Sequence, residues 1–182
     1  MAHNPLSSHA KSPEAIKKMR QAGKLAATVL DRVTPLVKPG VTTEALNAFC
    51  HKLITEEMDA IPAPLNYRGF PKSVCTSVNH VICHGIPSDK KALRAGDIIN
   101  IDVTVIKDGY HGDTSRMYCV GKPPILAKRL VQVARECLYI GINMVKPGAS
   151  LKAIGKAIAD HAHQHNFSSV RDFCGHGIGT DF

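Results

Sequence analysis

Two aspartates, Asp102 and Asp113, stand in a stretch whose other residues are typical of a buried β-hairpin. Residues 98–106 are apolar at most positions, so a carboxylate in that strand is costly unless something neutralises it. Three kinds of partner could do so: a proton shared by the two carboxylates, a basic side chain such as Arg116, or a metal ion. The plainer alternative is that Asp113 makes turn hydrogen bonds while Asp102 pairs with a lysine or an arginine.

The turn between the two strands decides which side chains share a face. The Asp-Gly pair at 108–109 predicts a two-residue type I′ turn, which sets Thr104 opposite Asp113 and Asp102 opposite Ser115. Because side chains alternate along a strand, both aspartates then lie on one face as diagonal neighbours, with Cα atoms about 7–8 Å apart. Two carboxylates so placed could hold one cation or a pair. A single bulge would move Asp113 to the other face.

Two histidines have glycine neighbours that leave the imidazole uncovered. His84 lies in "VICHGIP", after an apolar stretch, and His176 lies in "DFCGHGIG". Each alone reads as a hydrogen-bonded structural histidine, but two such elements beside two strand aspartates favour a metal site. A third group, "HAHQH" at 161–165, ends a predicted helix. There we expect a solvated C-terminal turn that favours the helix dipole, and not a metal site.

The composition is that of an ordinary globular domain. The chain has 182 residues, of which 44% are hydrophobic and 21% charged, enough for one sizeable core. The net charge of +8 is explained by a solvated basic surface, with an anionic partner such as the ribosome as the alternative. No RNP-like or zinc-finger motif supports specific nucleic-acid binding.

The first residues and the cysteines indicate a cytoplasmic protein. The start "MAHNPLSSHAKSPEA" lacks the apolar core of a signal peptide, and no stretch is long enough to span a membrane. The six cysteines are scattered without a C-x-x-C pair, so we expect reduced and mostly buried thiols. We expect a monomer that makes no membrane contact.

Hydrophobic spacing and breaker residues predict helices on both sides of a β-rich region. Ser12 is the expected N-cap of the first helix and Pro13 its first residue, and Thr42 or Thr43 caps the second. The expected segments are a helix over 12–35, a helix over 42–58, β structure over 67–120, a helix over 125–144 and a helix over 150–165.

One ten-residue pattern occurs twice. The segments "LVKPGVTTEA" (36–45) and "MVKPGASLKA" (144–153) are identical at five of ten positions and lie 108 residues apart. Each follows a long helix and precedes a shorter one, which predicts two copies of a helix–helix–sheet unit. A second sheet at the same offset would begin near residue 175 and run past residue 182. We therefore expect the second copy to be incomplete and the sequence to be truncated.

Three long motifs resemble bacterial type I methionine aminopeptidases. They are "YRGFPKSVCTSVNHVICHGIP" (67–87), "GDIINIDVTVIKDGYHGDTSRMY" (96–118) and "CGHGIG" (174–179), and the likeness runs from about residue 13 to 182. The resemblance implies the α/β pita-bread fold, with two pseudo-symmetric halves. We expect one catalytic domain over 12–182, with a first half over 12–122, an incomplete second half from about 124, and a short extension over 1–11.

The resemblance also implies a role for particular residues. Asp102 matches an aspartate that chelates one metal ion, Asp113 one that bridges two ions, and His176 an imidazole ligand. His84 matches a histidine that contacts substrate and assists proton transfer without binding metal. The implied lining of the methionine side-chain pocket is Tyr67, Phe70, Cys75 and Phe182, with Phe70 standing where a tyrosine is common. The implied cofactor is a pair of divalent ions, of cobalt, manganese, iron or zinc.

The implied activity is the removal of the N-terminal methionine from nascent proteins whose second residue is small. The family pattern also contains two glutamate ligands and a second active-site histidine, none of which occurs among these 182 residues. We therefore expect this fragment itself to be inactive. The alternatives are a shortened, non-catalytic relative that binds a peptide or the ribosome, and a related peptidase such as a prolidase. The Tyr67–Cys75 stretch and the compact N-terminus argue against the prolidase.

Overall fold

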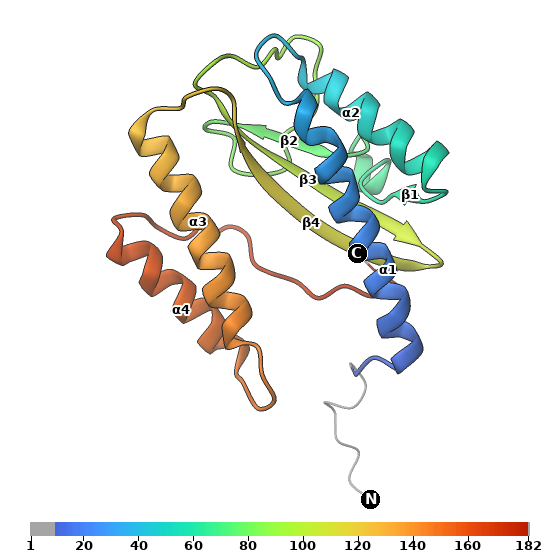
Figure 1. Cartoon of the computed structure of the whole chain (residues 1–182). Helices are drawn as coiled ribbons and strands as arrows, with labels where there is room; N and C mark the ends of the chain where they lie inside the picture. The colour runs from blue at the N-terminus through green and yellow to red at the C-terminus, as the bar shows by residue number, and fades with distance from the viewer. Residues whose placement is uncertain (1–9, 182) are drawn as a thin grey trace, which may run out of the picture. The chain divides into compact units, whose positions relative to one another are not determined.

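The computed structural model describes residues 10–181 (Figure 1). Within that range the chain forms two compact units, one of residues up to Gly121 together with Gly177 onward, and one of Lys122–His176. The first contains helices α1 and α2 and the sheet, and the second contains helices α3 and α4. The division after Gly121 falls beside the boundary expected near residue 122. The single domain over 12–182 and the extension over 1–11 stay predictions.

Helix α1 (Pro13–Val33) supports the sheet of the first unit. It begins where the sequence predicts, because the Ser12 hydroxyl accepts a hydrogen bond from the Ala15 amide at 3.1 Å. It ends slightly early, where Thr34–Leu36 tightens into a 3₁₀ turn. The residues of its buried stripe are Ala15, Ala22, Ala26, Val29, Leu30 and Val33. Three of these are alanines, so the helix axis can lie close to the strands beneath it.

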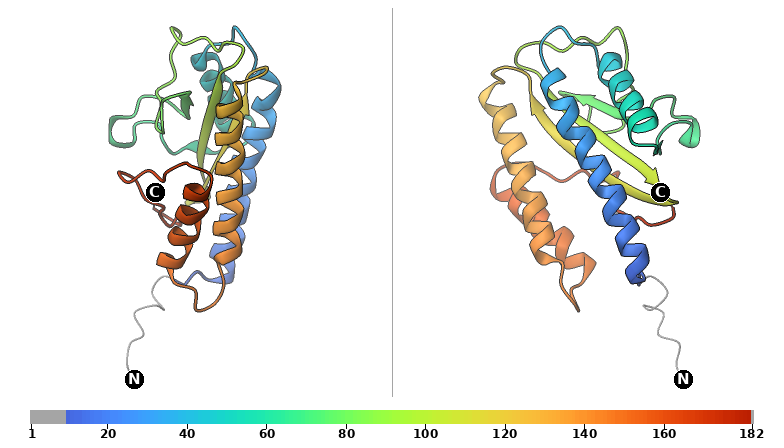
Figure 2. Two further views of the ribbon diagram at one scale, coloured as in Figure 1. Left: turned by 90° about the vertical axis from the view of Figure 1, so that its left-hand side faces the viewer. Right: turned by 45° about the vertical axis from the view of Figure 1, so that its right-hand side comes forward.

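Four antiparallel strands form the sheet of the first unit. They are β1 (Ile61–Pro62), β2 (Cys75–Val78), β3 (Ile98–Lys107) and β4 (Tyr110–Cys119). Strand β4 pairs with β3 along its whole length, so β1 and β2 share the other edge of β3. Figures 1 and 2 show α1 lying across one face of this sheet. The strands fill less of residues 67–120 than predicted, because residues 79–97 form a loop.

The core of the first unit lies between α1, α2 and this face of the sheet. Alternate residues of β3 provide its floor, and these fully buried side chains are Ile99, Ile101, Val103 and Val105. From β4, the Tyr118 hydroxyl donates a hydrogen bond to the Leu30 carbonyl of α1 at 2.8 Å. Gly112 faces the same helix at a point where a Cβ atom would overlap the Ala22 backbone. The opposite face of β3, which carries Asp102, is therefore turned away from α1.

Helix α2 (Thr43–Lys52) fixes the start of strand β2. The Thr42 hydroxyl caps it by accepting a hydrogen bond from the Ala45 amide at 3.1 Å. The side-chain oxygen of Asn47 accepts hydrogen bonds from the amides of Ser73 and Val74, at 2.9 and 3.3 Å. The chain then enters β2 at Cys75. The predicted helix up to residue 58 changes hydrogen-bonding pattern after Lys52, because Leu53–Glu57 forms a π-helical turn.

The second unit is a pair of helices. Helix α3 (Ile125–Met144) and helix α4 (Leu151–Gln164) are joined by the turn around Gly148, as the repeated sequence pattern predicts. Gly148 and its counterpart Gly40 both have positive φ, +79° and +89°. Both copies of the pattern therefore place glycine at a backbone conformation that other residues rarely adopt. No strand follows α4 in the chain described up to residue 181. None of the helices between residues 10 and 181 is long and apolar enough to cross a membrane.

The contact between Gly112 and α1 predicts a specific stability effect. Replacing Gly112 with alanine should lower the free energy of unfolding by about 3 kcal/mol, because the new methyl group must displace helix backbone and not a flexible side chain. Urea denaturation followed by circular dichroism measures the effect.

A glycine in α1 beside this contact provides the matched control. A Cβ atom added at Gly23 meets no atom within 4 Å. Gly23→Ala should therefore raise stability by about 0.5–1 kcal/mol, as expected for a glycine replaced within a helix. Equal effects of the two substitutions would show that Gly112 does not set the distance between helix and sheet.

Candidate active site

The paired strands β3 and β4 place the two aspartates on one face. Their pairing runs without a bulge from Ile98 opposite Cys119 to Lys107 opposite Tyr110. Within it Asp102 lies opposite Ser115, and Thr104 lies opposite Asp113, so the predicted register is confirmed. Both carboxylates are partly exposed on the face turned away from α1.

A buried hydroxyl orients the second aspartate. Thr104 is 2% exposed, and its Oγ1 donates a hydrogen bond to Asp113 Oδ1 at 3.0 Å. The bond joins the two strands through side chains on the face that carries Asp102. It limits the rotation of the Asp113 carboxylate, which is the property that a metal ligand needs from its surroundings.

Arg116 is excluded as the group that neutralises the aspartates. It lies opposite Ile101, on the face that packs against α1. Its Nη2 forms an ion pair with Asp31 Oδ1 of α1 at 2.9 Å. The basic side chain that the sequence analysis named for this role is therefore paired with another carboxylate.

Cys75 lies directly beside the two carboxylates. It is paired with Asp102 across β2 and β3 and is 7% exposed. Burial, with smaller contributions from the charges of Asp102, Cys83 and Asp113, raises the pKa of the Cys75 thiol to about 12. The side chain is therefore a neutral thiol at physiological pH. It can line an apolar pocket but does not supply a thiolate to a metal.

The loop after β2 brings His84 to this part of the sheet. The Thr76 amide donates to the Gly85 carbonyl at 2.8 Å, and the Gly85 amide donates to Ser77 Oγ at 3.1 Å. A Cβ atom at Gly85 would overlap the Thr76 carbonyl, so only glycine permits this approach. His84 is exposed and has a φ of +53°, a region that few residues other than glycine adopt. Burial and then the Asp102 charge raise the pKa of neighbouring Cys83, so this loop borders the carboxylate face.

Tyr67 and Phe70 belong to a loop anchored at both ends beside the same strand. The Ala63 amide donates to the Thr104 carbonyl at 2.9 Å at one end, and Cys75 pairs with Asp102 at the other. Between these anchors, Tyr67–Gly69 forms a 3₁₀ turn. The two predicted pocket residues are therefore tied to the segment of β3 that carries the aspartate.

His111 is a buried residue of this face to which the sequence analysis assigned no role. It is 6% exposed, its amide donates to the Gly179 carbonyl at 2.8 Å, and its ring Nδ1 lies 3.1 Å from the same oxygen. The ring nitrogen can act as the donor in one tautomer. His111 thus holds the segment after Gly177 against β4, two residues before Asp113. The signal in the sequence was its place on the aspartate face of the predicted hairpin.

The roles predicted for all these site residues stay predictions, and for two of them the position relative to the aspartates stays a prediction as well. His176 is the last residue of the second unit and lies on an exposed segment after α4. Its coordination together with Asp102 and Asp113 remains an expectation from the resemblance. Phe182, predicted to line the methionine pocket, lies outside the described residues.

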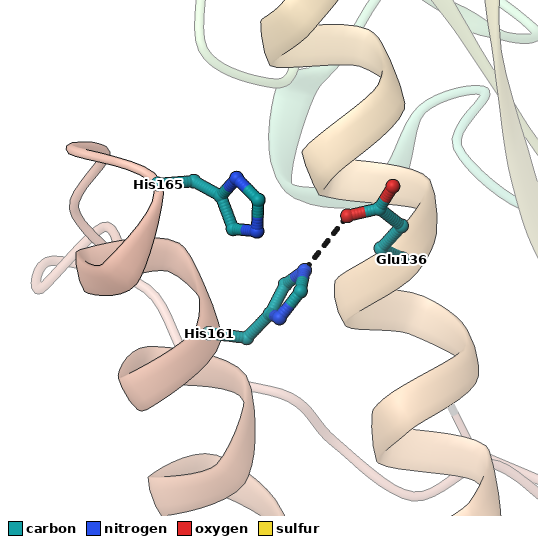
Figure 3. Close-up of side chains that lie close together, drawn as sticks. All are labelled: Glu136, His161 and His165. Atoms are coloured by element: carbon teal, nitrogen blue, oxygen red, sulfur yellow. Dashed lines mark hydrogen bonds and ion pairs between the residues drawn. The ribbon is translucent and has the colours of Figure 1, made fainter.

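The expectation of a solvated turn at 161–165 is wrong for two of its three histidines. His163 is exposed, but His161 and His165 are partly buried because α3 packs along α4. His161 Nε2 lies 2.8 Å from Glu136 Oε2 of α3, and the ring centroid of His165 is 4.6 Å from that of His161. Figure 3 shows the three side chains turned toward one another between the helices. The sequence could not pair Glu136 with this segment without knowing how the two helices pack.

Comparison with known proteins gives the family. The model of metallopeptidase family M24 matches residues 17–182. The chain belongs to metallopeptidase family M24. It is 58% identical over 172 residues to a methionine aminopeptidase of Salmonella typhimurium, and 62% identical over 165 residues to one of Rickettsia prowazekii. These matches cover 94% and 91% of the chain. The chain spans 65% and 63% of the length of these relatives.

Solved structures agree with this membership of family M24. The crystal structure of the Rickettsia prowazekii methionine aminopeptidase matches with a TM-score of 0.92 and 59% identity, over 94% of this chain and 68% of that one. A methionine aminopeptidase of Thermotoga maritima matches with a TM-score of 0.91 and 34% identity, over the same shares. An X-Pro aminopeptidase of Thermotoga maritima, at 20% identity and a TM-score of 0.77, shows the fold alone. The predicted pita-bread fold is confirmed, with its second half incomplete in this chain.

The proximity of Cys75 to Asp102 predicts a change in thiol reactivity. In the Asp102→Asn variant one negative charge is removed, so the pKa of Cys75 should fall and its alkylation at about pH 10 should become roughly threefold faster. Mass spectrometry of iodoacetamide-treated protein measures each cysteine separately.

Cys50 provides the internal control for this measurement. It is buried as well, and burial alone raises its pKa to about 12. Its alkylation rate should be the same in the variant and the parent chain. Equal acceleration at both cysteines would indicate general loosening of the fold and would contradict the electrostatic explanation.

Proposed function

We propose that the protein is a metal-dependent aminopeptidase that removes the N-terminal methionine from proteins with a small second residue. The observation that carries this proposal is the unbroken register of β3 and β4, which sets Asp102 and Asp113 on one partly exposed face. Membership in family M24, a metallopeptidase family, implies a divalent metal cofactor. The relatives named methionine aminopeptidase support the choice of substrate.

The residues on this face fit a divalent cation. Two carboxylates provide oxygen ligands. Burial and then their negative charge raise the pKa of the Cys75 thiol, and a bound cation would lower it. We assign Asp102 to one ion and Asp113 to a bridge between two, with the Asp113 carboxylate held by Thr104. Oxygen ligands with one imidazole suit manganese, iron, cobalt or zinc.

His176 is the proposed imidazole ligand of the same centre. Support comes from chain connectivity, because His176 precedes Gly179 by three residues and His111 holds the Gly179 carbonyl. Three extended residues span at most about 11 Å. His111 is itself two residues from Asp113 along β4.

The proposed substrate pocket is apolar and adjoins the carboxylates. Tyr67, Phe70, Cys75 and Phe182 would line it around the methionine side chain. The neutral thiol of Cys75 suits a thioether, because both are polarizable groups that pack as hydrophobes. The exposed imidazole of His84 would hydrogen-bond the scissile peptide and assist proton transfer.

The chemistry follows from these positions. Two ions held at this face would supply a water molecule of lowered pKa and a binding position for the free α-amino group. Asp102 and Asp113 fix the ions at the sheet, while the buried Thr104 hydroxyl keeps Asp113 in one orientation. His84 donates a hydrogen bond to the carbonyl oxygen of the first peptide, where negative charge develops. An exopeptidase results, because only a free terminal amine completes the site.

The remaining expectations also belong to this proposal. Nascent peptide N-termini are the substrates, and the charge of +8 suits contact with the ribosome. A cytoplasmic monomer is proposed. The residues present here supply Asp102, Asp113 and His176, while the two glutamate ligands of the family pattern have no counterpart among these 182 residues. We therefore propose that this fragment has little or no activity by itself.

Metal binding by the sheet should depend on each aspartate separately. Asp102→Asn and Asp113→Asn should each weaken Mn²⁺ binding to the chain by at least roughly tenfold, because each removes a ligand. Isothermal titration calorimetry measures the affinity. Asp108→Asn is the matched control, since it removes the same charge from the exposed turn of the same hairpin, where an asparagine also adopts the observed φ of +51°. Equal weakening in all three variants would show that the affinity depends on net charge alone and not on these two ligands.

The activity assignment predicts a difference between the given chain and a completed one. The purified 182-residue chain with Mn²⁺ should release little or no methionine from the peptide Met-Ala-Ser. A chimaera that adds the remaining C-terminal part of the Rickettsia prowazekii relative should release it, and a chelator should abolish the release. Chelator-sensitive release from the 182-residue chain would contradict the inactivity of the fragment. Cleavage of Xaa-Pro peptides in place of Met-Ala-Ser by the chimaera would contradict the methionine assignment.

A further inference from the structure

Three ligand-type side chains gather between the two helices of the second unit. They are Glu136 of α3, His161 of α4 and His165 just after α4, all partly buried. One ligand atom from each residue lies within 4.8 Å of the ligand atoms of the other two. Figure 3 shows the carboxylate and both imidazoles turned into the same space.

The local sequence explains why two imidazoles share a face. His161 and His165 are four residues apart, and positions four apart lie one above the other on a helix. The His165 amide still donates to the carbonyls of His161 and Ala162, at 3.3 and 3.2 Å, so the helical turn extends to this residue. His163, between them, is exposed.

The packing of α3 on α4 brings the carboxylate to the imidazoles. Gly141 allows this close approach, since a Cβ atom there would lie 3.0 Å from Ile158 Cδ1. One turn nearer the cluster, Cys137 Sγ donates a weak hydrogen bond to the Ile158 carbonyl at 3.6 Å. Glu136 is the next residue of α3 and faces His161.

We propose that Glu136, His161 and His165 form a binding site for one divalent transition-metal ion, with Zn²⁺ as the best fit. Two imidazoles and one carboxylate are a known ligand set for zinc, which leaves a fourth tetrahedral position for water. Imidazole nitrogen favours zinc, nickel, copper and iron over magnesium and calcium, which prefer oxygen. The site uses no residue of the first unit and none of the residues assigned to the peptidase centre.

Binding would replace the hydrogen bond between His161 and Glu136. The His161 Nε2 and Glu136 Oε2 atoms are 2.8 Å apart, whereas each would lie about 2.0–2.2 Å from a zinc ion placed between them. Because the carboxylate accepts this bond, His161 Nε2 carries a proton: a neutral imidazole must move it to Nδ1 before binding the ion, and a protonated one releases it to solvent. Binding therefore weakens as pH falls.

The groups around Glu136 favour its ionised carboxylate and leave the site open to solvent. Gln132 Nε2 donates to Glu136 Oε1 at 2.9 Å, and this bond and the one with His161 hold the pKa of Glu136 below its usual value. An open groove on this surface is lined by Gln132, Arg135, Glu136, Tyr139, Ile140, Asn143 and His161. Arg135 lines that groove, and Arg129 Nη2 donates to the His165 carbonyl at 3.5 Å, so both guanidinium groups would oppose the ion. The Glu136 charge offsets them in part.

Zinc binding to the whole chain tests the proposal. The Asp102→Asn, Asp113→Asn double variant lacks both carboxylates assigned to the peptidase centre. Zinc binding in this background therefore tests the second site independently of the proposed peptidase function. Equilibrium dialysis should find one Zn²⁺ per chain in this background. Glu136→Gln, His161→Gln or His165→Gln should each weaken binding by at least roughly 100-fold, because each removes a ligand.

His163→Gln is the matched control, since it removes an exposed imidazole from the same segment and should leave zinc affinity unchanged. Circular dichroism shows whether each variant is still folded. A second readout is the visible absorption of Co²⁺ bound in place of zinc, which should report a four-coordinate nitrogen and oxygen site and disappear in the three ligand variants. The proposal is overturned by absence of bound zinc, by equal loss in the His163 variant, or by a cobalt spectrum that the ligand variants leave unchanged.

Discussion

The unbroken register between β3 and β4 is the constraint on which the candidate active site depends. A strand has two faces, and a shift by one residue exchanges them. Here one face packs so closely against α1 that position 112 has no room for a side chain, and the other face must present two carboxylates. If β4 slipped by one residue, Asp113 would be pressed against the apolar helix. The packing of the core and the placing of the carboxylates are therefore one structural requirement.

The two units offer metals different kinds of ligand. The sheet of the first unit presents carboxylate oxygens, whose charge suits hard and borderline ions. The helix pair of the second unit presents mainly imidazole nitrogen, with Glu136 as the single carboxylate. Each set is held by secondary structure: strand pairing fixes Asp102 relative to Asp113, and the helical turn fixes His161 relative to His165. Under the two proposals, the chain therefore has two metal sites with distinct preferences.

The parts of the structure that local patterns determine could be predicted from the sequence. The Ser12 and Thr42 caps, the hairpin turn at 108–109 and the pairing of Thr104 with Asp113 each depend on a few neighbouring residues, and all are confirmed. What the sequence analysis missed depends on contacts between distant segments. The hold of His111 on Gly179 joins residues 68 apart, and the Glu136–His161 pair depends on how α3 packs against α4. Neither leaves a periodic signal in the chain.

The bond between His111 and the Gly179 carbonyl has a consequence for the order of folding. The β3–β4 hairpin closes a loop of two residues, whereas the His111 contact must close one of 68, at a larger cost in chain entropy. During synthesis the hairpin also leaves the ribosome before the segment after Gly177 does. The two carboxylates can therefore be in place before the segment around Gly179 docks. Its contact with His111 then forms late, along the edge of β4.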